Sequence, residues 1–220
     1  RAGDYTFRVR TIARYADRAG DWSEYSDENT VTERQVSSNG NGSWIQNQYG
    51  WWYRYYDGGY PSNTWEKINN TWYYFNRDGY MLNGWQQLSG SWYYLGANGA
   101  MTRGWQSVNG RWYYMNGDGV MLTGWQYLGG RWYFLDSSGA MLTGWQFING
   151  AWYFLDGSGA MLTGWQFING HWYYMNDSGI MLTGWQFING AWYYLDGSGA
   201  MYADQTTPDG YYVDGSGKRN

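Results

Sequence analysis

Short apolar runs separated by turn-forming residues make up most of the chain. In one unit, the runs 145–148 (WQFI) and 151–155 (AWYFL) flank the pair Asn149-Gly150. An Asn-Gly pair between such runs is a strong hairpin signal, because both turn residues must adopt a positive φ. The pattern therefore predicts a β-hairpin with a two-residue turn, and Asp156 to Gly159 predicts a reversal loop after it.

A two-residue turn also predicts which side chains share a face of this hairpin. Phe147 should face Trp152 across the strands, and Trp145 should face Phe154, so these four aromatic residues share one face. The other face carries further apolar side chains, at Ile148, Tyr153 and Leu155. A lone hairpin is marginal in water, so both faces must be covered by neighbouring units.

The same unit returns every 20 residues. Its first Trp recurs at Trp65, Trp85, Trp105, Trp125, Trp145, Trp165 and Trp185, and its second at Trp72, Trp92, Trp112, Trp132, Trp152, Trp172 and Trp192. A less regular copy, with Trp44 and Trp52, precedes them. A fixed period of this length predicts an all-β solenoid of stacked hairpins over residues 44–220, with about eight repeats and a shortened C-terminal repeat as a cap.

Composition narrows the functional classes. Aromatic residues reach 23%, with 18 Trp and 25 Tyr, whereas the net charge is only −4 and Cys is absent. Sparse charge argues against nucleic-acid binding, and the lack of Cys excludes disulfides and thiolate sites. No apolar run is long enough for a membrane helix, and no signal peptide is visible. Because the chain starts at Arg1 without Met, we expect a fragment or a processed product.

Residues 1–36 differ in composition from the repeats. Tyr5, Phe7 and Val9 alternate with polar residues, which predicts a strand. The segment from Asp4 to Thr32 resembles the last strands of a fibronectin type III domain, most of which would then lie upstream. The alternative is a β-hairpin that covers the first repeat. Residues 37–43 are small and polar and are interpreted as a linker.

The repeat GWQFINGAWYFLDGSGAMLT, from Gly144 to Thr163, resembles the cell-wall-binding repeat of choline-binding proteins from Gram-positive bacteria and their phages. Related repeats occur in streptococcal glucosyltransferases and in large clostridial toxins. The resemblance covers Trp44 to Gly217 and implies a left-handed β-solenoid with ligand pockets between consecutive hairpins. It also implies a non-catalytic attachment module, secreted and held at a bacterial cell surface through choline-bearing teichoic acid.

The resemblance implies that each pocket takes two aromatic residues from one repeat and one from the next, with a Met nearby. The implied groups are Trp65, Trp72, Tyr93 and Met81; Trp85, Trp92, Tyr113 and Met101; Trp105, Trp112, Tyr133 and Met121; Trp125, Trp132, Tyr153 and Met141; Trp145, Trp152, Tyr173 and Met161; and Trp165, Trp172, Tyr193 and Met181. The copies at Trp44 with Trp52 and at Trp185 with Trp192 and Tyr211 depart from the pattern and are left out.

Aromatic cages suit a quaternary ammonium, which is attracted to ring faces by about 0.5–2 kcal/mol per contact. Weak sites in a row would gain avidity on a polymer. Two alternatives remain. The row of Gln residues beside the first Trp (Gln86, Gln106, Gln126, Gln146, Gln166 and Gln186) would suit a glycan such as glucan. The aromatic residues could also serve only the core of a structural stalk that self-associates, for example as a homodimer.

Catalytic chemistry finds little support. The only His, His171, occupies a slot that holds Ala151 and Arg131 in other repeats, which indicates a solvated residue beside a turn. The loop carboxylate Asp156 is replaced by Asn176 one repeat later. Capping of a turn by an Asx side chain explains that exchange, whereas a catalytic pair would not tolerate it. We therefore expect no enzyme activity, no cofactor and no metal site.

Overall fold

The computed structural model describes residues 41–219. The segment resembling a fibronectin domain, residues 1–36, lies outside the described residues, as do the first four residues of the expected linker. Every regular element in the described part of the chain is a β-strand.

Each strand pairs antiparallel with its neighbour in sequence to form a two-stranded hairpin, β1 with β2 and so on to β17 with β18. The strands are β1 (Gly42–Asn47), β2 (Gly50–Tyr55), β3 (Thr64–Ile68), β4 (Thr71–Phe75), β5 (Gly84–Leu88), β6 (Ser91–Leu95), β7 (Gly104–Val108), β8 (Arg111–Met115), β9 (Gly124–Leu128), β10 (Arg131–Leu135), β11 (Gly144–Ile148), β12 (Ala151–Leu155), β13 (Gly164–Ile168), β14 (His171–Met175), β15 (Gly184–Ile188), β16 (Ala191–Leu195), β17 (Gln205–Thr206) and β18 (Tyr212–Val213).

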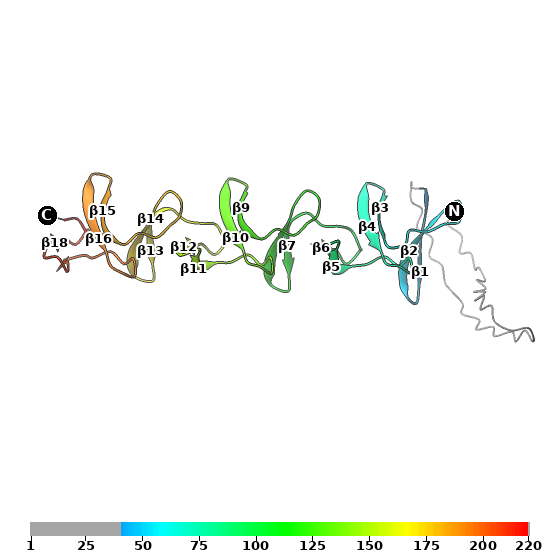
Figure 1. Ribbon diagram of the computed structural model, residues 1–220, viewed down its shortest axis with the longest axis horizontal. Helices are drawn as coiled ribbons and strands as arrows, with labels where there is room; N and C mark the ends of the chain where they lie inside the picture. Colours follow the sequence, from blue (N-terminus) through cyan, green and yellow to red (C-terminus); the bar gives the residue numbers. More distant parts are fainter. Residues whose placement is uncertain (1–40, 220) are drawn as a thin grey trace, which may run out of the picture. The chain divides into compact units, whose positions relative to one another are not determined.

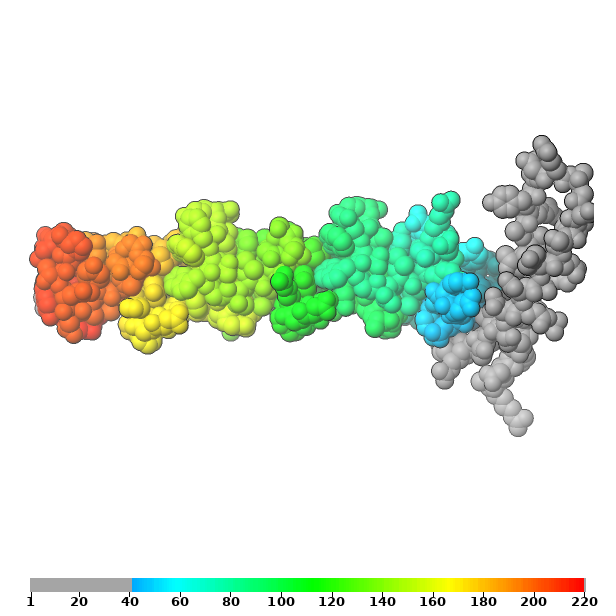
Figure 2. All heavy atoms as spheres, turned by 90° about the horizontal axis from the view of Figure 1, so that it is seen from below, coloured from blue at the N-terminus to red at the C-terminus, as the bar shows by residue number. Residues whose placement is uncertain are grey.

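The described residues form two compact units. Unit 1 comprises residues 41–104 and 115–120, and unit 2 comprises 105–114 and 121–219. Within each unit, successive hairpins follow one another in chain order (Figure 1). In the space-filling view, hairpins of unit 2 such as the yellow one project from the surface as lobes (Figure 2).

The turns have the conformation that their sequence predicts. In the β11–β12 hairpin, Asn149 and Gly150 have φ values of 50° and 85°. Even Asn69-Asn70, the least favourable pair, adopts positive φ at both residues, 48° and 67°. Asn tolerates this left-handed region better than other residues with a Cβ, which explains why the pair can replace Asn-Gly.

The strand register confirms the predicted faces. Trp145 lies opposite Phe154, and Phe147 lies opposite Trp152. On the other face, Leu155 is fully buried. From the second hairpin onward, the core of each hairpin is the last residue of its second strand, which has no exposed surface at Phe75, Leu95, Met115, Leu135, Leu155, Met175, Leu195 and Val213. Aliphatic residues and Met thus provide most of these fully buried positions.

Within each unit, the segment after a hairpin connects that hairpin to the preceding one. The amide of Leu162 donates to the carbonyl of Phe154 in its own hairpin, at 3.0 Å, and the neighbouring amide of Met161 donates to Trp132 in the hairpin before, at 2.8 Å. Stacking of hairpins through their own backbone confirms the β-solenoid fold class. The left-handed superhelix stays a prediction.

The first hairpin corrects two details of the sequence reading. Trp51, and not Trp52, occupies the second Trp position, since its carbonyl accepts a bond from Met81 (2.7 Å) just as later second Trp residues do. The indole Nε1 of Trp52 is instead buried without a hydrogen-bond partner. Strand β1 begins at Gly42, so Gly42 and Ser43 of the expected linker belong to a strand. Gly42 pairs with Tyr55 there.

Candidate functional site

Three aromatic rings from two consecutive hairpins lie together beside four repeats of unit 2, those of Trp105, Trp125, Trp145 and Trp165. In one example, the ring centroids of Trp145 and Trp152 are 6.4 Å apart with an interplanar angle of 85°. Tyr173, from the next hairpin, lies 4.8 Å from Trp145 at 67°. These steep angles are edge-to-face arrangements, in which the rings are not stacked face to face. Trp152 remains 43% exposed, so one wall of this aromatic group is open to solvent.

The same geometry recurs along the chain. The first Trp lies 4.8–5.0 Å from the Tyr of the next hairpin in the pairs Trp65–Tyr93, Trp105–Tyr133, Trp125–Tyr153, Trp145–Tyr173 and Trp165–Tyr193. The two Trp rings are 6.3–6.5 Å apart at Trp85–Trp92, Trp105–Trp112, Trp125–Trp132, Trp145–Trp152 and Trp165–Trp172. Tyr113, expected beside Trp85 and Trp92, belongs to unit 2, whereas both Trp residues belong to unit 1.

The Met residues contact neighbouring repeats through both their backbone and their side chains. The amide of Met181, and not that of Met161, donates to the carbonyl of Trp152, at 2.8 Å. The side chain of Met161 lies against Gly179, where an added Cβ would come within 2.3 Å of its sulfur. The backbone of Met181 therefore meets Trp152, because its segment bonds to the hairpin before its own. A place for the side chain of Met161 beside Trp145 and Trp152 stays a prediction.

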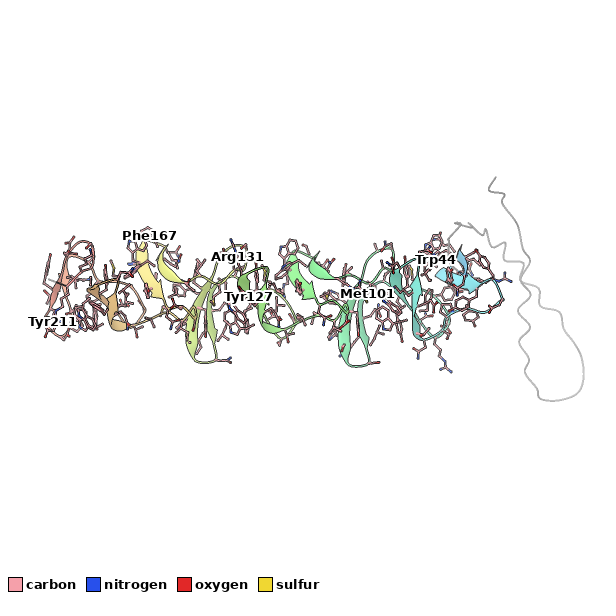
Figure 3. The ribbon with its side chains drawn as sticks, turned by 90° about the horizontal axis from the view of Figure 1, so that it is seen from above. Trp44, Met101, Tyr127, Arg131, Phe167 and Tyr211 are labelled. Atoms are coloured by element: carbon pink, nitrogen blue, oxygen red, sulfur yellow. The ribbon has the colours of Figure 1, made fainter. Side chains whose placement is uncertain are left out.

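A further aromatic residue flanks the second Trp in four consecutive hairpins. Phe147 lies 5.2 Å from Trp152 and is 61% exposed. Tyr127, Phe167 and Phe187 hold the same position beside Trp132, Trp172 and Trp192. Figure 3 labels Tyr127 and Phe167. The sequence predicted Phe147 opposite Trp152 but did not indicate it as part of the candidate site. A usable signal is that this position is polar in earlier repeats, as at Lys67 opposite Trp72, and aromatic in later ones.

The Gln row does not point its amide nitrogens at the aromatic groups. Nε2 of Gln146 donates to the backbone carbonyl of Thr143 at 2.8 Å. Equivalent bonds hold Gln86, Gln126, Gln166 and Gln186 to the carbonyl three residues before each of them. These side chains therefore stabilise the entry into the first strand. The Gln row, which was the argument for glycan binding, is thus explained by its structural role.

The loop carboxylates are turn caps, as the Asp–Asn exchange predicts. Oδ1 of Asp156 accepts bonds from the amides of Ser158 (2.8 Å) and Ala160 (3.0 Å) and from the Ser158 hydroxyl (2.6 Å). Asn176 accepts the corresponding amide bonds through its own Oδ1. Partial burial alone would raise the pKa of Asp156, but the bonds from Ser158 and Ala160 outweigh it and hold that pKa below its ordinary value.

Two searches for other kinds of site found nothing in the described residues. Across 41–219, no group of three or more His, Cys, Asp or Glu side chains is placed to hold a metal ion. Within that same range, no helix is long and apolar enough to span a membrane.

Comparison with known families gives a match over most of the chain. The family model described as the choline-binding repeat matches residues 62–104, 102–142, 122–163, 142–174 and 162–205. A search of curated protein sequences found no match.

Solved structures from Streptococcus pneumoniae are similar to this chain. Choline binding protein F, solved in the presence of a peptidoglycan analogue, is 41% identical with a TM-score of 0.72, over 77% of this chain and 61% of that one. CbpJ is 34% identical with a TM-score of 0.73, over 85% of this chain and 69% of that one. The modular autolysin LytC is 34% identical with a TM-score of 0.59, over 80% of this chain and 42% of that one. The chain thus spans only 61% of the length of the first of these relatives.

Proposed function

This chain belongs to the choline-binding repeat family, and we propose that its aromatic groups are the individual choline sites of a cell-wall attachment module. The observation that carries the proposal is the group of Trp145, Trp152 and Tyr173, whose rings meet at steep angles with one wall open to solvent. The four other expected groups whose residues all lie within one unit are proposed to bind in the same way.

The physical basis is the chemistry of the trimethylammonium group. It has no hydrogen to donate, so ring faces, which carry a negative quadrupole, are its natural partners. Each contact is worth about 0.5–2 kcal/mol, so one group binds choline only weakly. Several groups on a rigid stack engage a choline-bearing polymer together, and avidity then provides firm attachment.

The proposed partner is therefore a choline-bearing teichoic acid at a bacterial cell surface, and the protein is proposed to be secreted. In the autolysin LytC, similar repeats make up part of a longer, modular chain. By analogy, we propose that the repeats described here provide attachment for whatever other domains accompany them. Homodimer formation through the repeats stays a proposal that a measured molar mass, with and without choline, would test.

The experiment is a titration of choline chloride followed by Trp fluorescence. Tetramethylammonium is the positive control for the cation alone, sodium chloride controls for ionic strength, and dextran tests the glycan alternative. A saturable change with choline and tetramethylammonium, and none with salt, supports the proposal. A response to dextran alone would replace it with glycan binding. Silence with every ligand, together with concentration-dependent assembly, would favour a structural stalk.

A further inference from the structure

Arg219 occupies the position that Met holds in the other repeats. Its amide donates to the carbonyl of Trp192 at 2.9 Å, as the amide of Met201 donates to Trp172 at 2.8 Å. Arg219 also forms a bridge to the buried Val213, as each Met does to the buried residue of its own hairpin. The structural register thus equates Arg219 with Met201, although the shortened last repeat hides this in the sequence.

The side chain of Arg219 lies over the rings of the last aromatic group. Its guanidinium carbon is 3.6 Å from the ring centroid of Tyr211 and 5.7 Å from that of Trp185. Both distances lie within the range of about 6 Å over which a ring face attracts a cation. Trp185 and Tyr211 are themselves 5.9 Å apart at 80°, so they form the same kind of ring pair as Trp145 and Tyr173. Figure 3 labels Tyr211 on the last hairpin.

A carboxylate strengthens the preference of this group for a cation. Oδ2 of Asp209 accepts a bond from the indole Nε1 of Trp185 at 2.8 Å, and Oδ1 accepts one from the Thr207 hydroxyl at 2.6 Å. The bonds from Thr207 and Trp185, with a contribution from the charge of Arg219, hold the pKa of Asp209 below its ordinary value. Asp209 is therefore ionised at neutral pH beside the rings that Arg219 covers.

We infer that the ring pair of Trp185 and Tyr211 is a cation site whose occupant is the chain's own Arg219. The guanidinium takes the place at Trp185 and Tyr211 that the quaternary ammonium would take in the other groups. This last group is therefore closed to choline at concentrations that fill the others. The inference rests on the proposed function, because it assigns an internal competitor to one of the proposed sites.

The test compares the wild-type 220-residue chain with Arg219→Met, which restores the residue of the other repeats. Arg131→Ala is the matched control, because it removes one positive charge from a slot that holds Ala in other hairpins. Each protein carries 5-fluorotryptophan, and ¹⁹F NMR follows Trp185 and Trp145 during a choline titration. Resonances are assigned with Trp185→Phe and Trp145→Phe.

In wild type and in Arg131→Ala, the Trp145 signal should shift as choline is added. The Trp185 signal should shift only at choline concentrations about twofold to thirtyfold higher, which is the factor in affinity that one cation–π contact contributes. In Arg219→Met, both signals should shift together, and equilibrium dialysis should find one more choline bound per chain. If that variant fails to fold, Arg219→Gln replaces it.

Two results would overturn the inference while leaving the proposed function intact. One is a Trp185 signal that shifts together with Trp145 in the wild-type chain. The other is a Trp185 signal that stays silent in a folded Arg219→Met variant. A Trp145 signal that choline does not move in any of the proteins would instead refute the proposed function, and the inference would be wrong with it.

Discussion

Two neighbouring loop glycines, Gly157 and Gly159, should respond very differently to replacement by Ala. At Gly159 the φ angle is 84°, and an added Cβ would lie 2.4 Å from the sulfur of Met141 in the preceding repeat. At Gly157 the φ angle is not positive, and an added Cβ would meet nothing within 4 Å. The pair therefore contrasts a strained glycine that the Met of the preceding repeat contacts with one that is free of both constraints.

The cost of Gly159→Ala has two parts. A residue with a Cβ in the left-handed region costs about 1–2 kcal/mol. Displacing Met141 from a packed position costs about 1–3 kcal/mol more. We expect a local destabilisation of about 2–5 kcal/mol. Gly157→Ala should instead be neutral or stabilise by up to about 1 kcal/mol, because it restricts the unfolded chain.

Amide hydrogen exchange is the appropriate assay, because repeat arrays unfold unit by unit and one global free energy is poorly defined. The reporter is the amide of Met161, which bonds to Trp132 in the hairpin before. Its opening free energy should fall in Gly159→Ala and stay unchanged in Gly157→Ala. In a Met141→Ala background, Gly159→Ala should cost only the backbone part, about 1–2 kcal/mol. Equal protection in the two single variants would refute this account of repeat stacking.

The remaining predictions concern the aromatic groups and the loop caps. Trp152→Leu removes one ring face, so choline should bind the group of Trp145 about twofold to thirtyfold more weakly, as followed by ¹⁹F NMR of Trp145. The control His171→Ala should leave this affinity unchanged, and equal affinities in the two variants would contradict the proposed site. Lys67→Phe replaces a cation opposite Trp72 by the ring found in later repeats, so choline affinity at that group should rise a few-fold by ¹⁹F NMR of Trp65. An unchanged affinity would count against electrostatic control. In amide hydrogen exchange at pH 7, Asp156→Ala should lower the opening free energy of its loop by about 1–2 kcal/mol, whereas Asp156→Asn should keep most of the cap. Because the pKa of Asp156 is lowered in the folded protein, the ionised carboxylate contributes fully to stability above a pH of about 4, and this contribution is lost as the pH falls through the folded pKa. If the stability advantage of wild type over Asp156→Asn persisted unchanged in acid, that would be evidence against the cap.

The regular hairpins could be predicted from sequence because their signals are local. Asn149-Gly150 specifies the turn, and the turn fixes that Trp145 faces Phe154. The first hairpin was misread because its turn, Gln48-Tyr49, carries no such signal, so the Trp spacing alone suggested Trp52 instead of Trp51.

The other differences arise from contacts between repeats, which a period cannot specify. The spacing of Met161 and Trp152 does not reveal that a Met segment bonds to the hairpin before its own. The bond from Gln146 to the carbonyl of Thr143 depends on the rotamer of the Gln146 side chain, which the sequence does not specify. Arg219 was missed because the last repeat is shortened, so that its equivalence to Met201 appears only in the hydrogen bonds.

The most direct test of the central claim is a crystal structure of the chain grown or soaked with choline. The account predicts density for a trimethylammonium group within about 6 Å of the ring centroids of Trp145, Trp152 and Tyr173, and the same arrangement at the other proposed groups. Empty aromatic groups at a choline concentration that saturates the fluorescence change, with choline bound elsewhere, would contradict it.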